Sequence, residues 1–370
     1  MLNILAAILL FGLIVLVHEF GHFLLAKLNG IGVVEFSIGM GPRLASFVHG
    51  ETRYSLKALP FGGSCMMVGE DSADPNPKAF NNKSVFARIA VIAAGPVFNF
   101  ILAFFAGILI VSQVGHDNPV LIGVEDGSPA QEAGLMPGDK ITRINNRKIS
   151  AYRDIQLYTL SHPGQELTIS YERPAGGSWE NKGAAEKRTA VLTPAFNEEY
   201  QAYMLGVLFA GYEKTDSFAE LIRCSAYEVK YCIVSTFDSL RMLFTKQLPV
   251  EDAVTGPVGI VSMVGETVEQ GREAGAMVLI VILANWVLLL SSSLGIMNLF
   301  PIPALDGGRL FFLFLELLRG KPMDPEKEGM VHFAGLVLLM ALMVIVMAND
   351  ITGPMALPIL KQMSDTVFDK

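Results

Sequence analysis

Apolar residues gather in four long stretches along the chain, and these stretches predict helices that cross a membrane. They cover residues 2–27, 85–114, 277–299 and 331–347. Each is as long, or nearly as long, as the roughly 20 residues that span a bilayer core. A fifth stretch, residues 310–318, is too short to cross and predicts a buried or interfacial helix. Composition agrees, because 51% of residues are hydrophobic and only 17% are charged, whereas soluble domains carry about a quarter charged residues.

Lysine and arginine in the short connections predict the orientation of these spans. The first connection carries basic residues from Lys27 to Lys83 and the last from Arg309 to Lys327, while none precedes the first span. By the positive-inside rule both connections are cytoplasmic. Both termini and residues 115–276 are then extracytoplasmic. The first span lacks the basic region and cleavage site of a signal peptide, so we expect it to be retained.

The polar parts divide the chain further. Residues 33–67 alternate apolar and polar side chains, which predicts short β-strands at the cytoplasmic membrane face. Residues 115–211 mix strand patterns with turn signals, and residues 216–247 have the spacing of an amphipathic helix. We therefore predict a polytopic α-helical membrane protein with a small β-element and one inserted α+β domain. Residues 1–114 form the first membrane half, and residues 115–211 form the inserted domain. Residues 212–275 form a linker with a helix and a GPVGI loop, and residues 276–370 form the second membrane half.

The first apolar stretch runs directly into the sequence HEFGH at residues 18–22. On a helix, His18 and His22 share one face and can bind one Zn²⁺, and Glu19 lies where it can deprotonate a bound water. Alternatively, a histidine on an apolar helix is simply a hydrogen-bonded core residue. Polar side chains at membrane depth are costly, which favours a functional site that faces the protein interior.

Asp306 is the best candidate for a third zinc ligand, since catalytic zinc normally takes three. It lies in NLFPIPALDGGR, residues 298–309, where two prolines end the third span and two glycines permit a tight turn. His18 is roughly 24 Å along the first helix, so both residues are expected near the cytoplasmic ends of their spans. The alternative is that Asp306 only caps the following helix.

These motifs together resemble the site-2 protease family of intramembrane zinc metalloproteases, and more closely its bacterial sigma-factor-regulating members with a single PDZ domain. Matching stretches cover nearly the whole chain in order, and they include HEFGH at 18–22, GGSCMMVGE at 62–70, AGPVFN at 94–99, GPVGI at 256–260 and NLFPIPALDGGR at 298–309. One departure is Ser293, which stands where members often have an asparagine. A serine cannot replace the reach of an amide, which puts any role of that asparagine in doubt here.

The resemblance implies an active site with one bound Zn²⁺. His18, His22 and Asp306 would be its ligands, Glu19 the general base, and Asn298 a residue that helps hold the substrate or the developing oxyanion. The implied activity is cleavage of transmembrane segments in single-pass membrane proteins already shortened outside, that is, regulated intramembrane proteolysis. Implied substrates are anti-sigma factors and remnant signal peptides, and the implied location is a bacterial cytoplasmic membrane.

Residues 124–145 resemble part of a PDZ domain, and Leu205, Gly206 and Val207 resemble the carboxylate-binding loop of a circularly permuted PDZ fold. Such a domain binds an extended peptide by strand addition. Alternatively, it only excludes bulky substrates. Family resemblance also suggests that the strands within residues 33–67 dip toward the active site and pair with an unwound substrate. The simpler alternative is a hairpin that packs the helices together.

Two other functions fit part of the pattern. A catalytically silent scaffold would use the PDZ domain alone, and a zinc transporter would use the intramembrane histidines and Asp306 as a transit site. A glutamate between two intact histidines argues against both, and a transporter needs no peptide-binding domain. The net charge of −8 and the lack of a basic patch argue against a nucleic-acid partner. The three cysteines are predicted to be buried thiols, not disulfides.

Overall fold

The computed structural model describes residues 2–70, 74–175, 185–200, 202–245 and 256–352. These residues belong to two compact units. The first comprises Met1–Gly107 and Val250–Lys370, and the second is Ile108–Pro249. The second unit therefore contains both the domain predicted at residues 115–211 and the helix predicted after it.

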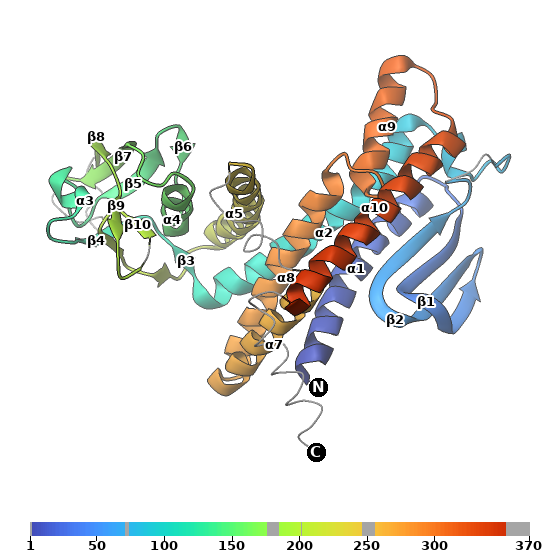
Figure 1. The fold of residues 1–370 in the computed structure, drawn as a ribbon, viewed down its shortest axis with the longest axis horizontal. Helices are drawn as coiled ribbons and strands as arrows, with labels where there is room; N and C mark the ends of the chain where they lie inside the picture. Colours follow the sequence, from blue (N-terminus) through green and yellow to red (C-terminus); the bar gives the residue numbers. More distant parts are fainter. Residues whose placement is uncertain (1, 71–73, 176–184, 201, 246–255, 353–370) are drawn as a thin grey trace. The chain divides into compact units, whose positions relative to one another are not determined.

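Four of the described helices are long and apolar enough to cross a membrane, which confirms the four predicted spans (Figure 1). These helices are α1 (Leu2–Leu28), α2 (Val85–Val114), α8 (Ala276–Leu299) and α10 (Pro325–Thr352). Along α10 most side chains are exposed on the isolated chain, as expected of a helix whose apolar surface faces lipid.

The segment expected as a GPVGI loop is instead the beginning of helix α7 (Pro257–Ala274). Gly256 is its N-cap, and Pro257 occupies the first position, where a missing N–H breaks no helical hydrogen bond. The carboxylate of Asp350 on α10 accepts from the backbone N–H groups of Gly256 and Gly259, at 2.9 and 3.0 Å. This buried side chain therefore ties the start of α7 to the last span.

The short apolar stretch at residues 310–318 forms helix α9 (Asp306–Arg319), as predicted. Leu310 and Leu313 are buried in a core cluster with residues of α1, α2 and the neighbouring strands. Arg88 of α2 and Glu316 of α9 form a mostly buried ion pair in the same region. These contacts hold α9, whose first residue is Asp306, against α1 and α2.

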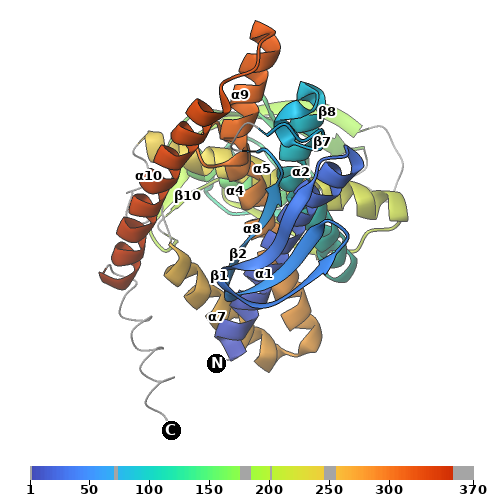
Figure 2. The same cartoon turned by 90° about the vertical axis from the view of Figure 1, so that its right-hand side faces the viewer.

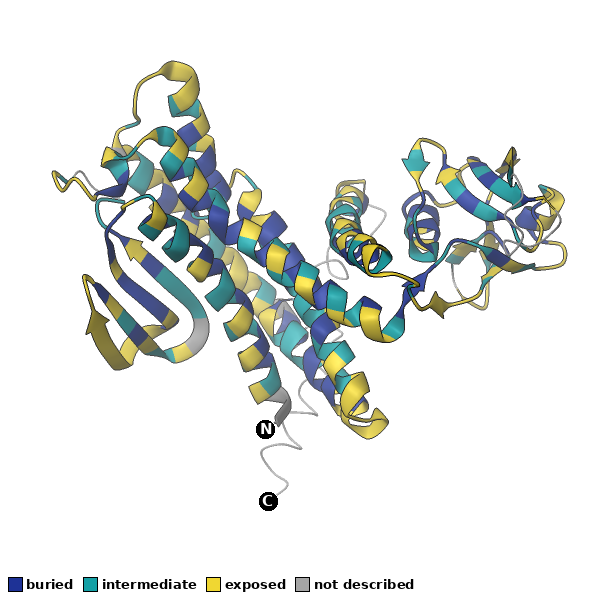
Figure 3. Cartoon of the chain, turned by 180° about the vertical axis from the view of Figure 1, so that it is seen from behind, coloured by how far each residue is buried: buried dark blue, intermediate teal, exposed yellow. Residues whose placement is uncertain are grey.

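The strands predicted within residues 33–67 are confirmed as β1 (Val33–His49) and β2 (Thr52–Met67), which lie against α1 (Figure 2). Phe36 is opposite both Tyr54 and Cys65, so the first half of β1 pairs with two stretches of β2. The second half of β1, from residue 40 to 49, is exposed (Figure 3). In the first half of β1, Glu35 and Ser37 are buried, while Val34 and Ile38 are exposed.

Glu35 can be buried because cationic and hydroxyl groups surround its carboxylate. Arg43 donates to both carboxylate oxygens at 2.7 and 3.1 Å, and Ser55 Oγ donates at 2.6 Å. Lys57 Nζ lies 3.7 Å away. The hydrogen bond from Arg43 lowers the pKa of Glu35 to about 2, so the carboxylate stays charged.

We expect Glu35→Gln to lower the free energy of unfolding at pH 7 by about 1–3 kcal/mol, because it removes the partner of two cations. A depressed carboxylate pKa stabilises the folded state at neutral pH, and this contribution disappears as the pH falls from about 4.5 toward 2. Thermal unfolding in detergent at pH 7 and pH 3 measures both effects. The exposed Glu166→Gln is the control, and equal melting of Glu35→Gln and the parent at pH 7 would contradict the expectation.

The described residues of the second unit form a four-stranded antiparallel sheet and three two-stranded pairs. The sheet has the order β6 (Arg147–Lys148), β5 (Lys140–Ile144), β7 (Leu167–Pro174), β8 (Ala185–Leu192). The pairs are β3 (His116–Asp117) with β12 (Tyr212–Glu213), β4 (Leu121–Val124) with β11 (Val207–Phe209), and β9 (Ala195–Asn197) with β10 (Ala202–Met204). Helices α3 (Pro129–Glu132) and α4 (Tyr152–Ser161) contribute to one apolar core with these strands.

The amphipathic helix predicted at residues 216–247 is α5 (Phe218–Phe244), and charged groups fix it to α4. Arg153 of α4 donates to both carboxylate oxygens of Glu228 on α5 at 2.9 Å, and it also pairs with Asp117. Arg147 and Asp238 form a second ion pair between the strands and α5. Burial raises the pKa of Glu228, and Arg153 opposes that effect. Helix α5 therefore belongs to the second unit and is not a separate linker.

Candidate metal centre

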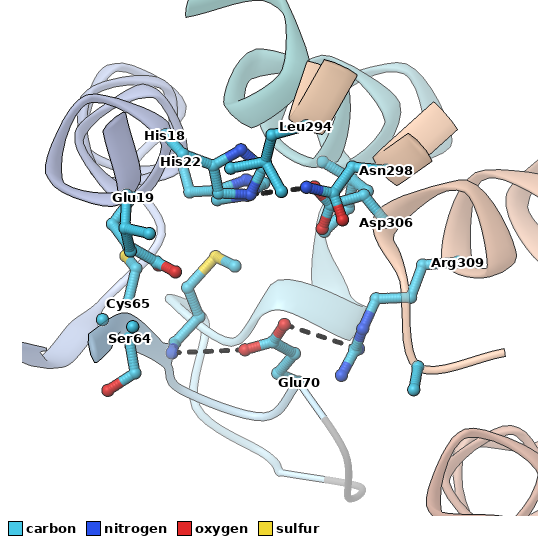
Figure 4. Close-up of a pocket in the computed structure, with 16 residues that line it drawn as sticks. His18, Glu19, His22, Ser64, Cys65, Glu70, Leu294, Asn298, Asp306 and Arg309 are labelled. Atoms are coloured by element: carbon cyan, nitrogen blue, oxygen red, sulfur yellow. Dashed lines mark hydrogen bonds and ion pairs between the residues drawn. The ribbon is translucent and has the colours of Figure 1, made fainter. Parts of the chain in front are cut away.

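A cavity of about 480 Å³ lies within the first unit and brings together side chains from α1, α2, β2, α8 and α9 (Figure 4). Its lining includes His18, Glu19 and His22 of α1, Cys65 of β2, Asn298 of α8 and Asp306 of α9. The structure thus brings together all five predicted catalytic and zinc-binding residues.

The three predicted ligands have the spacing of a zinc site. His18 Nε2 and His22 Nε2 are 3.2 Å apart, and they lie 3.2 and 3.4 Å from Asp306 Oδ2. In a tetrahedral site with zinc–ligand distances of about 2.0–2.1 Å, ligand atoms are about 3.3 Å from one another. Two ring nitrogens and a buried carboxylate oxygen in this arrangement are therefore suited to Zn²⁺. His18, His22 and Asp306 are also the one such group found among the described residues.

Two glycines let α1 and α2 approach closely enough to form the centre. A Cβ on Gly21 would lie 2.5 Å from the carbonyl oxygen of Ala94. A Cβ on Gly95 would lie 2.3 Å from His22 Nε2 and 2.7 Å from His18 Cε1. Since real Cβ contacts are not this short, the backbone of α2 at Gly95 directly covers the metal-binding edges of both rings.

His22 is held in one tautomer by α2. Its Nδ1 donates to the backbone carbonyl of Val91 at 2.9 Å. With the proton on Nδ1, the Nε2 lone pair faces His18 and Asp306, as metal binding requires. Such a hydrogen bond from the second ring nitrogen is the usual support of a metal-binding histidine.

A tight turn before α9 presents Asp306, and α10 holds this turn. Ala304 has a positive φ of 77°, and its N–H donates to His332 Nδ1 at 3.0 Å. A Cβ on Gly335 would lie 2.5 Å from Pro303 Cβ, so α10 also packs closely against the turn. The N-cap of α9 is Leu305 rather than Asp306. The alternative role of Asp306 as a helix cap is therefore wrong, and its carboxylate is directed at the histidines.

Glu19 lies at the boundary between α1 and β2. A Cβ on Gly63 would lie 2.9 Å from Glu19 Cγ, so the strand passes directly over this side chain. Across the cavity, α8 contributes Leu294 and Asn298 to the lining. Ser293 is not among the described residues that line it, so nothing in the structure gives that departure a role.

All three cysteines are buried and free, as predicted, and Cys65 lies in the cavity lining. Burial and the nearby Glu19 raise the pKa of the Cys65 thiol. Because only the thiolate is reactive, we expect iodoacetamide at pH 8 to alkylate Cys65 at least about 10-fold more slowly than in the unfolded chain. Peptide mass spectrometry of native and SDS-unfolded protein measures this ratio. Equal rates in the two states would show that the thiol is exposed.

Sequence reasoning missed Gly95 and Asn99 as parts of the site. Asn99 is fully buried, and its side-chain amide lies 3.2 Å from His18 Nδ1. Both residues belong to AGPVFN, and their spacing of four places them on one face of α2. That spacing is the signal from which they could have been found.

The predicted peptide-binding residues lie in the second unit. Leu205 is buried, and its carbonyl accepts from the N–H of Ala130. The carbonyl of Gly206 accepts from the N–H of Glu125, and Val207 begins β11. Gly206 has a φ of 75°, and a Cβ there would overlap Ser128. The three residues thus form a tight turn before a strand, and their role in binding a peptide stays a prediction.

Comparison with known proteins finds a metalloprotease family that matches most of the chain. A model of the family described as Peptidase family M50 matches residues 6–342. The zinc metalloprotease RasP of Shouchella clausii is 31% identical, over 95% of this chain and 99% of that protein. The regulator of sigma-W protease RasP of Bacillus subtilis is 32% identical, over 94% of this chain and 98% of that protein.

Proposed function

The chain belongs to peptidase family M50 and is a multi-pass membrane zinc metalloprotease, and on that basis we propose that it cleaves transmembrane segments of single-pass membrane proteins. The observation that carries the proposal is the position of the three ligand atoms. They lie 3.2–3.4 Å apart in a cavity shared with Glu19, and two of them come from a helix apolar enough to span a membrane.

In the proposed reaction His18, His22 and Asp306 hold the zinc ion. A zinc ion bound there would lower the pKa of its water and would polarise the scissile carbonyl group. Glu19 accepts a proton from the attacking water and passes it to the leaving amine nitrogen. The side-chain amide of Asn298 donates a hydrogen bond to the substrate carbonyl oxygen as negative charge develops on it.

We propose that the stretch of β2 at residues 62–65 receives the unwound substrate. A transmembrane helix satisfies its own backbone hydrogen bonds, so a peptide bond becomes accessible only after local unwinding. This stretch lines the cavity beside Glu19 and pairs with β1 through Gly63, Ser64 and Cys65. An extended substrate that pairs with the strand would keep its freed backbone groups satisfied.

We propose that the second unit admits only substrates whose extracytoplasmic part has already been shortened. We propose that it is a PDZ domain on the extracytoplasmic side, and that its Leu205–Gly206–Val207 turn binds a newly formed C-terminus or the domain excludes long ectodomains. Anti-sigma factors and remnant signal peptides are proposed substrates. The sigma-W-regulating role in the name of the Bacillus subtilis relative supports the first of these.

The test uses the purified full-length chain in liposomes with two substrates that share one transmembrane segment. One substrate keeps a folded ectodomain, and the other is cut to a short stub. We expect zinc-dependent cleavage within the membrane segment of the stub only, located by mass spectrometry and abolished by 1,10-phenanthroline. Cleavage outside that segment would contradict the proposal. Zinc flux without proteolysis, lost in Asp306→Asn, would favour a transporter.

A further inference from the structure

We infer that Asn99 of α2 is a positioning residue that holds His18 in the tautomer needed to bind zinc. The inference rests on the proposed metal site and adds a residue outside the ligand set. Asn99 has no exposed surface, and its side-chain amide lies 3.2 Å from His18 Nδ1. An amide placed at the second ring nitrogen of a ligand histidine controls which nitrogen of that ring carries the proton.

The two histidines need the same kind of support and receive it from different groups. A neutral imidazole can offer the Nε2 lone pair to a metal only when Nδ1 carries the proton, so the neighbour of Nδ1 must be an acceptor. For His22 that acceptor is the carbonyl oxygen of Val91, at 2.9 Å. For His18 the neighbouring group is the Asn99 amide, which contains one acceptor and one donor.

The two orientations of the Asn99 amide have opposite effects on His18. With Nδ2 toward His18, the amide donates to Nδ1, and the ring proton then sits on Nε2, which lies 3.2 Å from Asp306. In that orientation Asn99 Oδ1 is buried and has no hydrogen-bond partner in the described part of the chain. A half-turn of the amide exchanges the two atoms in almost the same space. Oδ1 then accepts from Nδ1–H, the unpartnered oxygen is satisfied, and the Nε2 lone pair faces the ligand cluster.

Packing on both sides keeps Asn99 at this position. Ser291 of α8 donates a hydrogen bond to the backbone carbonyl of Asn99 at 2.9 Å. One turn earlier on the same face, Gly95 lies directly over both histidine rings. The backbone of Asn99 is thus held by α8, and its side chain faces His18. A half-turn of the terminal amide alone is therefore enough to bring Oδ1 to His18 Nδ1.

The experiment compares zinc affinities of Asn99→Leu and Asn99→Asp by competition with a chromogenic chelator. Both variants are made in the full-length Glu19→Gln chain, so proteolysis does not enter the measurement. We expect Leu, which fills similar space without an acceptor, to weaken zinc binding by about 10–100-fold. Asp keeps an acceptor oxygen and is expected to retain the affinity of Asn. A residue that only fills space would give the reverse order, because Leu suits a buried position and a carboxylate does not.

Two further variants make the result decisive. Ser292→Ala removes another fully buried hydroxyl from α8 and should leave zinc affinity unchanged. If Asn99→Leu does not fold, Asn99→Ala takes its place. The inference then requires that the Asn99→Asp variant bind zinc more tightly than the Asn99→Ala variant. Zinc binding by Leu or Ala equal to that of the Glu19→Gln parent would overturn the inference while leaving the proposed function intact. Absence of bound zinc in both the unsubstituted chain and the Glu19→Gln parent would overturn the inference and the proposed function together.

Discussion

Glu19→Gln is expected to lower the rate of substrate cleavage by about 10²–10⁴-fold while one zinc remains bound to each chain. Glutamine has nearly the same shape as glutamate but cannot accept a proton from water. None of the three ligand atoms belongs to Glu19, so the 3.2–3.4 Å spacing is unaffected. Metal content by mass spectrometry and single-turnover cleavage of the shortened substrate measure the two quantities.

The matched control is Glu132→Gln, which makes the same chemical change at an exposed residue of α3. It should leave both zinc content and rate unchanged. Cleavage by Glu19→Gln at the parent rate, with zinc bound, would remove Glu19 from the mechanism. Loss of zinc together with activity would instead show that Glu19 is needed to assemble the centre.

Gly95→Ala is expected to weaken zinc binding by about 100-fold or more. The added methyl group would lie 2.3 Å from His22 Nε2 and 2.7 Å from two ring carbons, so the rings must move away from the ligand geometry. The atoms in conflict are the ends of side chains rather than backbone. The helices should therefore still pack, and the melting temperature should change little. Chelator competition and thermal unfolding measure the two effects separately.

Gly12→Ala is the control for this prediction. It makes the same substitution in a membrane-spanning helix, at a position where a Cβ meets nothing within 4 Å. Its zinc affinity should equal that of the parent chain. If Gly95→Ala also bound zinc with parental affinity, α2 would not lie over the histidines as the structure shows.

The length of the apolar stretches was enough to predict the four spans, and two motifs, HEFGH and NLFPIPALDGGR, predicted the proposed ligand set. Apolar length alone identifies the four spanning helices, since few other structures bury so many consecutive apolar residues. The spacing of His18 and His22 follows from helix geometry. Asp306 was predicted as the third ligand because an acidic residue at membrane depth is costly unless it has a functional partner.

The remaining features depend on contacts that one sequence does not display. Alternation in residues 33–38 predicts a strand, but not which face is buried. Glu35 is buried because its partners come from later positions, Arg43, Ser55 and Lys57. Likewise Asn99 supports His18 only because α2 crosses α1 at Gly95. The helical start at Gly256 was predictable from the proline after it, which is common at the first position of a helix.

The wide separation in sequence between the proposed zinc ligands has a consequence for biosynthesis. Two ligands are made within the first 22 residues, but the third follows roughly 280 residues later, and its turn is held by His332. At about 5–20 residues per second, a growing chain spends roughly 15 to 60 s with two of its three proposed ligands. On the proposed ligand set, zinc would be bound stably only once α9 and the turn that α10 holds are in place. An unfinished chain that lacks Asp306 would therefore be a membrane protein without proteolytic activity.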